Sequence, residues 1–325
     1  MVALKAAGGN RRGVECGLKR DLKGTRLLLS ACFSLCLAAV GTAVSGSTEV
    51  KGTAPAASSP TAPASSASSL SHQALEAGNP GLSATDPRQL GWEIFAEKDR
   101  RDSGFGDYQA SLEMILYTPR GKPVRRTLQL RQIEQSDDGD RLLLSFNSPK
   151  TIKGTGLLSY SHRNSIDDQW LYLPAIKRVK KIAARDKSGP FLSSEFSFED
   201  LSVQELADYD YRFLAEETVA GYPSFKVERI PHDSYSGYSR QVVWLDKQEY
   251  RIHRIDYYDR KGKLEKTLKS DEFERFGGRF WKPHRMVMHD HRRDRTTELL
   301  WTDFRFGVGL LADRDFTTNS LKRVF

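Results

Sequence analysis

The side chains best placed for chemistry lie close together near the C-terminal end. In an extended strand His289 and His291 point to the same face, which is a spacing that metal ligands use. The other members of this group are His284, Asp290 and Asp294. Three arginines, Arg292, Arg293 and Arg295, lie among them, and their positive charge disfavours a divalent cation. We therefore interpret the group as the polar end of a strand and expect no metal site.

Paired carboxylates are a second candidate for catalysis, because glycoside hydrolysis uses two acidic side chains. Asp137-Asp138-Gly139 is ordinary turn chemistry, however, and Asp167-Asp168 is expected in a loop. The sequence contains no Gly-x-Ser-x-Gly turn, phosphate-binding loop or dinucleotide fingerprint. We expect no catalytic residue and no cofactor, so the chain is predicted not to be an enzyme.

The N-terminal 43 residues are predicted to be a cleavable export signal. A basic flank precedes an uncharged apolar run, residues 27–40, and small residues follow up to Ala43, where we place the cut. An uncleaved anchor is an alternative, but the run is shorter than the ~20 residues of a membrane span. Lipidation at Cys32 is another alternative, although most of the apolar run would then follow the modified cysteine.

Charge and cysteine content set further limits once this leader is set aside. The chain has 50 Lys and Arg against 42 Asp and Glu, but the leader holds much of the excess, and the rest is near neutral. A near-neutral body argues against nucleic-acid binding. All three cysteines lie in the leader, so the rest has no disulfide and no thiol nucleophile.

Residues 44–85 are predicted to be a disordered linker, because their Ser-, Ala- and Pro-rich composition offers few large apolar side chains. Residues 86–325 contain all five Trp and all twelve Tyr and are predicted to form one domain.

The dominant period in this domain is two, which predicts strands with one wet and one dry face. We expect a mainly β (α+β) fold, in which eight to eleven strands form one large curved antiparallel sheet. Asp86-Pro87 predicts a helix that runs to about Arg100, and a second short helix is expected from Glu199 to Ala207. Two helices cannot cover such a sheet, so its dry concave face is a candidate apolar binding site.

Apolar side chains at strand and loop positions are the candidates for lining this face. Phe191, Phe196 and Phe198 lie in a Ser- and Gly-rich loop, where they form either a movable lid or a plug. The candidates on strands are Trp170, Tyr172, Trp244, Met286 and Met288. A basic strip, Lys177, Arg178, Lys180 and Lys181, is interpreted either as a charged edge strand or as a contact for lipid head groups at a membrane surface.

Three motifs in order resemble the outer-membrane lipoprotein-sorting protein family, a LolA-like group of periplasmic proteins. They are Lys-Gly-Thr-Gly-Leu-Leu-Ser-Tyr at 153–160, Asp-Asp-Gln-Trp-Leu-Tyr-Leu-Pro at 167–174 and Phe-Leu-Ser-Ser-Glu-Phe-Ser-Phe-Glu-Asp-Leu at 191–201. The similarity extends from residues 101–107 to residues 316–321. One departure is the segment Gly189-Pro-Phe-Leu-Ser-Ser, where the family usually has a second glycine.

The resemblance implies an incomplete β-barrel with helices at its mouth, whose interior receives the acyl chains of a lipoprotein or lipid. It implies a periplasmic carrier without catalytic residues, and it suggests an inner-membrane transporter as a partner. The alternative is a non-catalytic envelope adaptor whose barrel is filled by its own side chains.

Overall fold

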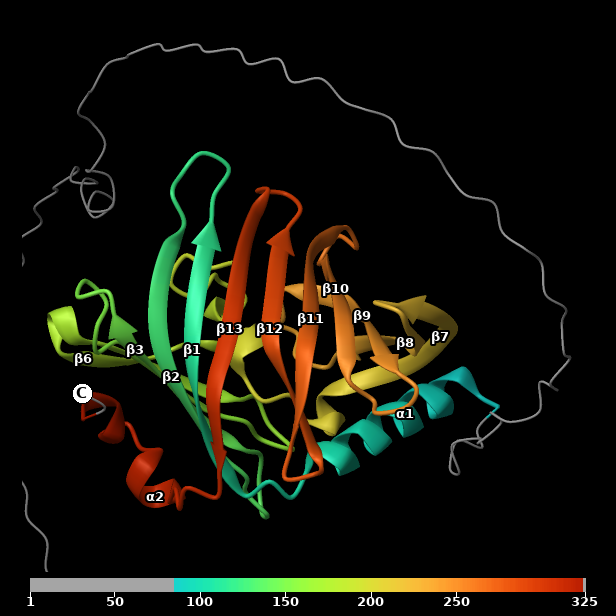
Figure 1. The fold of residues 1–325 in the computed structure, drawn as a ribbon, viewed down its shortest axis with the longest axis horizontal. Helices are drawn as coiled ribbons and strands as arrows, with labels where there is room; N and C mark the ends of the chain where they lie inside the picture. The colour runs from blue at the N-terminus through green and yellow to red at the C-terminus, as the bar shows by residue number, and fades with distance from the viewer. Residues whose placement is uncertain (1–84, 324–325) are drawn as a thin grey trace, which may run out of the picture. The chain divides into compact units, whose positions relative to one another are not determined.

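Residues 85–323 are described by the computed structural model and form one antiparallel sheet with few helices (Figure 1). The predicted leader and nearly all of the predicted linker lie outside the described residues. The strand order is β6-β5-β4-β3-β2-β1-β13-β12-β11-β10-β9-β8-β7. The strands are β1 Asp107–Tyr117, β2 Val124–Ile133, β3 Arg141–Ser148, β4 Gly156–Tyr160, β5 Asp168–Leu173, β6 Arg178–Lys181, β7 Tyr209–Val219, β8 Tyr222–Pro231, β9 Tyr238–Asp246, β10 Ile252–Asp259, β11 Leu264–Phe276, β12 Phe280–Asp290 and β13 Arg295–Phe306.

The mainly β fold and the curved antiparallel sheet are confirmed, but the expected eight to eleven strands are too few, because residues 85–323 form 13. The strands β4 and β6 are only five and four residues long, too short for a period of two to be visible in the sequence. In addition, three of the four residues of β6 are charged, so its sequence shows no apolar face.

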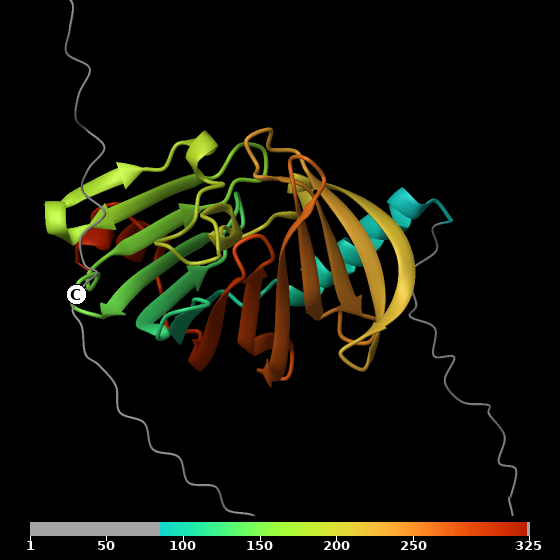
Figure 2. The same cartoon turned by 90° about the horizontal axis from the view of Figure 1, so that it is seen from above.

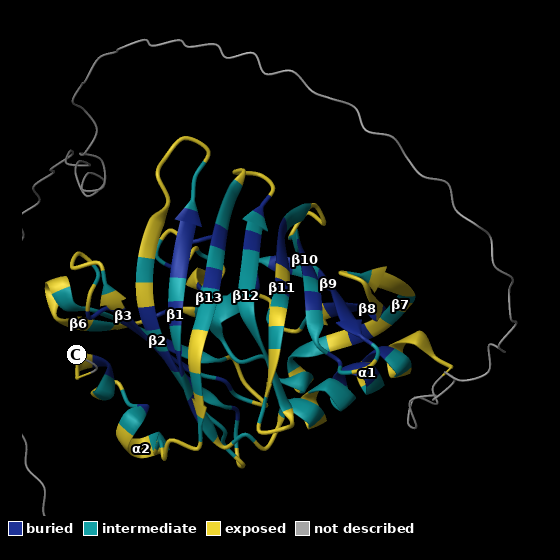
Figure 3. Cartoon of the chain, viewed as in Figure 1, coloured by how far each residue is buried: buried dark blue, intermediate teal, exposed yellow. Residues whose placement is uncertain are grey.

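The sheet is strongly curved, so that β3 to β6 and β7 to β10 lie on opposite sides of a trough (Figure 2). Alternation along β1 explains why the concave face is apolar, because Leu112, Met114 and Leu116 all point to that face and belong to the main apolar core. Burial of one such side chain stabilises the fold by about 1.5–3 kcal/mol. In Figure 3, β1 carries buried residues along its length and β12 is mostly intermediate, whereas the turns at the strand ends are exposed.

The helix α1 (Pro87–Asp102) lies at one end of the trough and packs on β7 (Figure 1). Its start is as predicted, because the Asp86 side chain accepts a hydrogen bond from the Arg88 N–H at 3.0 Å. Gly91 permits the close packing: a Cβ there would lie 2.8 Å from the backbone nitrogens of Arg212 and Phe213. Ile94 and Phe95 face the core.

The connection between β6 and β7, residues 182–208, crosses the trough from one edge of the sheet to the other (Figure 2). We call it the crossing segment. It contains three short 3₁₀ turns, η2 Ala184–Asp186, η3 Glu199–Leu201 and η4 Leu206–Asp208. The predicted helix from Glu199 to Ala207 is therefore wrong. Ser202 is extended, so η3 ends there. The Glu199 carboxylate accepts hydrogen bonds from Ser236 and Gly237, and the Asp200 carboxylate accepts them from Ser197 and Tyr238, so neither caps a helix.

The convex face of β3 to β6 is covered by the C-terminal segment, which includes α2 (Ala312–Asp315) and η5 (Ser320–Lys322). Phe316 and Leu321 are fully buried there against Leu143 and Leu158. The sheet is thus apolar on both faces at this end. Among the described residues, no helix is both long enough and apolar enough to span a bilayer.

Candidate functional site

A cavity of about 1190 Å³ lies at the end of the trough, between α1, the crossing segment and the concave face. We call it the mouth cavity. Its apolar lining comes from α1, from the strands and from the crossing segment, and includes Phe95, Phe105, Leu142, Val203, Leu206, Ile252 and Ile255. Its polar lining contains neutral, acidic and basic side chains, among them Asp99, Asp102, Glu134, Asp140, Glu205 and Lys282. The mouth cavity can therefore hold an amphiphile with an apolar body and a polar end.

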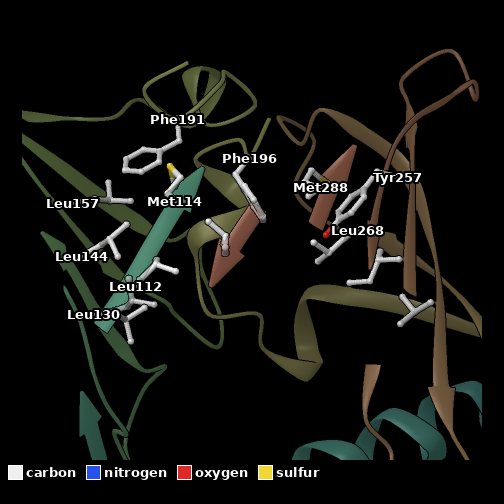
Figure 4. Packing of buried hydrophobic residues seen from close by; sticks show 14 of the residues in the cluster. Leu112, Met114, Leu130, Leu144, Leu157, Phe191, Phe196, Tyr257, Leu268 and Met288 are labelled. Carbon is white, nitrogen blue, oxygen red and sulfur yellow. The ribbon is translucent and has the colours of Figure 1, made fainter. Parts of the chain in front are cut away.

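The crossing segment fills the deeper part of the trough with aromatic side chains. Phe191 and Phe196 are buried, and Phe191 packs edge-on against Phe198 with ring centroids 5.5 Å apart. Figure 4 shows Phe196 between Met114 on one half of the sheet and Met288 on the other. The structure thus brings Phe191, Phe196 and Met288 together in one apolar core, with the partly buried Phe198 and Met286 packed against it.

A buried ion pair holds the crossing segment to the wall of the trough. Lys266 of β11 points inward, and its Nζ lies 2.7 Å from Asp200 Oδ2 and 3.1 Å from the Glu195 carbonyl oxygen. Asp200 also accepts hydrogen bonds from the Ser197 N–H at 2.7 Å and from the Tyr238 hydroxyl at 2.9 Å. The pair is almost completely shielded from solvent, with side-chain exposures of 7% and 2%. Such a pair has a high cost if one partner is removed.

The neighbouring Glu199 is a buried carboxyl with a strongly raised pKa. Its two oxygens accept hydrogen bonds from the Ser236 hydroxyl at 2.7 Å and from the Gly237 N–H at 2.9 Å. Burial, followed by the charge of Asp200, raises the pKa of Glu199 from 4.5 to about 7. The folded protein therefore holds a proton that the unfolded chain has already released between about pH 4.5 and pH 7. This contribution to stability is present below the unfolded pKa and is lost as the pH rises to about 7.

Replacement of Glu199 by glutamine is expected to remove this pH dependence. Since one pKa unit corresponds to 1.36 kcal/mol, the variant should gain about 1–3 kcal/mol relative to the wild type as the pH rises from about 4.5 to about 8. Urea denaturation across this pH range measures the difference. Glu272→Gln, at an exposed position, is the control and should follow the wild-type profile. Parallel wild-type and Glu199→Gln profiles would contradict the assignment.

Two carboxyls at the rim of the trough are also affected by burial. Burial raises the pKa of Asp140 from 3.8 to about 6, against the opposing hydrogen bonds from Gln132 and the Gln135 N–H. Burial likewise raises the pKa of Asp208 to about 6. Both side chains are held by hydrogen bonds within the protein.

Three of the predicted lining residues lie on the other face of the sheet and do not belong to the trough. Trp170 and Tyr172 pack on the convex face against the C-terminal segment. Trp244 also points outward, where its Nε1 donates to Glu217 at 2.8 Å and the Lys226 and Arg254 side chains lie over its ring. The period of two correctly places Trp170 and Tyr172 on the same face of their strand, but it does not say whether that face is the concave or the convex one. We remove all three from the candidate site.

The basic strip lies at the edge of the sheet, because β6 is its terminal strand. Lys177, Arg178, Lys180 and Lys181 are all exposed, although Lys181 Nζ also pairs with Asp168 at 2.6 Å. This placement agrees with the interpretation as a charged edge strand. Contact with lipid head groups stays a prediction.

The histidine group is bound within the protein. His289 Nδ1 lies 3.1 Å from the Thr296 hydroxyl, and His291 Nε2 lies 2.9 Å from the Thr267 hydroxyl. Among residues 85–323, no group of three His, Cys, Asp or Glu side chains is arranged to hold a metal ion.

Lys266, Lys282 and the isoleucines of β10 were not predicted as site residues. A signal existed for Lys266, which occupies an inward position between Leu264 and Leu268 in an alternating strand. No comparable signal existed for Lys282 and Ile252, because their role depends on where α1 and the crossing segment lie.

Comparisons with known proteins agree with this architecture. A family model described as "Uncharacterized protein" matches residues 138–323, more than half of the chain. A crystal structure from Vibrio parahaemolyticus, named for an outer membrane lipoprotein-sorting protein domain, is 44% identical with a TM-score of 0.71, and the match covers 73% of this chain and 100% of that one. A DUF1329 family protein from Desulfovibrio piger is 31% identical with a TM-score of 0.69 and the same coverage.

A LolA superfamily protein from Nitrosomonas europaea shares the fold, with 18% identity, a TM-score of 0.58, and coverage of 70% of this chain and 98% of that one. No curated protein matches the sequence. The identity to the Vibrio domain over most of the described residues shows that the chain belongs to the outer membrane lipoprotein-sorting protein family and has the LolA-like fold.

Proposed function

We propose that the protein is a periplasmic carrier that binds the acyl chains of lipoproteins or lipids in its trough. The observation that carries this proposal is the mouth cavity of about 1190 Å³, which opens onto the apolar concave face. Its volume exceeds the roughly 300–1,000 Å³ of typical ligand pockets. Transfer of an acyl chain from water to such a surface gains about 0.8 kcal/mol for each CH₂ group. The name of the Vibrio relative agrees with this substrate class.

The crossing segment gives the carrier a way to adjust its capacity. Phe191, Phe196 and Phe198 occupy the depth of the trough, so the mouth cavity is the entrance available while the segment stays in place. A guest longer than the mouth cavity would have to displace these rings. No step of this function needs a catalytic group, and an inner-membrane transporter is a suitable partner for loading or release.

The second candidate is a non-catalytic envelope adaptor, and one specific observation favours it. The aromatic side chains of the crossing segment already fill part of the trough, as an adaptor with a solid core would require.

Uptake of a neutral apolar fluorescent probe, N-phenyl-1-naphthylamine, distinguishes the two candidates. The protein should be produced as the full chain and purified after export. A carrier is expected to enhance the fluorescence saturably, and lauric acid should displace the probe. A protein that shows no saturable enhancement and yields no lipid on solvent extraction would overturn the carrier and support the adaptor.

A further inference from the structure

One cation in the mouth cavity, Lys282, has neither an ion pair nor a hydrogen bond in the described part of the chain. Lys282 of β12 is half-buried and lines the cavity. Its Nζ lies 5.0 Å from the centroid of the Tyr108 ring and 5.4 Å from that of Phe105, so the ammonium group rests on aromatic faces. Burial lowers the pKa of Lys282, and the nearby charge of Asp102 opposes this shift.

The carboxylates of the same wall are engaged elsewhere. Asp102 pairs with Lys98 at 2.8 Å, and Glu134 accepts hydrogen bonds at 2.7 Å from the N–H groups of both Gly104 and Gly106. Asp140 accepts from Gln132 at 3.1 Å. None of these carboxylates lies within 4.0 Å of Lys282 Nζ.

The other basic side chains of the cavity are also occupied. Arg229 donates to Gln241 at 2.8 Å, and Arg163 donates to the carbonyl oxygen of Ser136 at 3.1 Å. Lys282 therefore differs from every other described cation of this cavity, because its ammonium donors are left for a group that enters the cavity. A desolvated ammonium group gains most from a charged acceptor in direct contact.

We propose that Lys282 is the anchor for the acidic head group, carboxylate or phosphate, of a lipid whose acyl chain lies in the trough. The inference rests on the proposed carrier function and adds a substrate class to it. The apolar wall formed by Ile252, Ile255 and Phe95 lines the same cavity, so head group and chain have separate places in it. The acidic side chains nearby repel an anion at longer range, so recognition depends on contact with Lys282 itself.

Displacement of N-phenyl-1-naphthylamine by three ligands with the same twelve-carbon chain tests this inference. Laurate and dodecyl phosphate are anionic, and dodecanol is neutral. The wild type is expected to bind at least one anionic ligand roughly tenfold or more tightly than dodecanol, and the two anions show whether the site takes carboxylate or phosphate. Lys282→Gln should abolish this preference and leave dodecanol binding within about twofold of wild type, whereas Lys282→Arg should restore the preference.

Lys269→Gln is the matched control, because it removes the same charge from an exposed position on the adjacent strand β11. It should retain the preference. Equal losses for all three ligands in Lys282→Gln, or an unchanged preference, would overturn the anchor and leave the carrier function standing. Failure of all three ligands to displace the probe from the wild type would overturn the carrier function and the anchor together.

Discussion

Replacement of Lys266 by methionine is expected to lower the free energy of unfolding by about 3–5 kcal/mol. The substitution keeps the volume of the side chain but leaves the Asp200 carboxylate buried without its cation, at 2% side-chain exposure. The Glu195 carbonyl oxygen loses a donor at the same time. Both losses fall on the crossing segment, which is thereby released from β11. Urea denaturation followed by tryptophan fluorescence measures the effect.

Two further variants make this result specific. Lys269→Met, on the same strand but exposed, should change the free energy of unfolding by less than about 0.5 kcal/mol. Lys266→Met combined with Asp200→Asn should lose less than the sum of the two single variants, because the charge left unpaired by the first is removed by the second. Additive losses, or a loss below about 1 kcal/mol for Lys266→Met, would show that the pair does not hold the segment.

Replacement of Ile252 by aspartate is expected to weaken the uptake of a fatty acid at least tenfold. Ile252 is half-buried in the wall of the mouth cavity, so the substitution places a carboxylate where methylene groups of the guest would lie. The charge also repels the acidic end of a fatty acid. A tenfold loss corresponds to about 1.4 kcal/mol, well below the cost of bringing a charge against an acyl chain. Titration of the probe and its displacement by laurate give the affinities.

Val124→Asp is the matched control for this experiment. Val124 is 47% exposed on β2, outside the mouth cavity, and receives the same chemical change. Its affinity should equal that of the wild type, and circular dichroism should show that both variants are folded. If folded Ile252→Asp bound laurate as tightly as Val124→Asp does, the acyl chain would have to lie elsewhere.

The sequence allowed the sheet to be predicted because each strand carries its own local pattern. Alternation in residues 108–117 alone places Leu112, Met114 and Leu116 on one face, and the structure confirms that face as buried. The same reasoning failed for Trp170 and Tyr172. Their strand is apolar on both faces because a segment about 150 residues further along the chain, with Phe316 and Leu321, covers its convex side. A local pattern contains no information about such a distant partner.

The candidate site was less predictable than the fold for a similar reason. The aromatic residues of the crossing segment were expected near the trough, because Phe191, Phe196 and Phe198 are unusual in a Ser- and Gly-rich stretch. Whether these phenylalanines form a lid or a plug depends on the path of the crossing segment from β6 to β7. That path follows from the strand order, which places β6 and β7 at opposite edges of the sheet. Lys282 becomes a site residue only when α1 closes one end of the trough.

Paramagnetic relaxation of methyl signals can show whether an acyl chain lies in the trough. A fatty acid with a nitroxide on its chain should be bound to exported protein with labelled Ile and Leu methyl groups. We expect the strongest broadening at Leu142, Ile252 and Ile255, which line the mouth cavity, and clearly weaker broadening at Leu143, Leu158 and Leu321 on the convex face. Equal or stronger broadening at the convex-face leucines, or no broadening at a saturating concentration of the fatty acid, would show that the acyl chain does not lie in the trough.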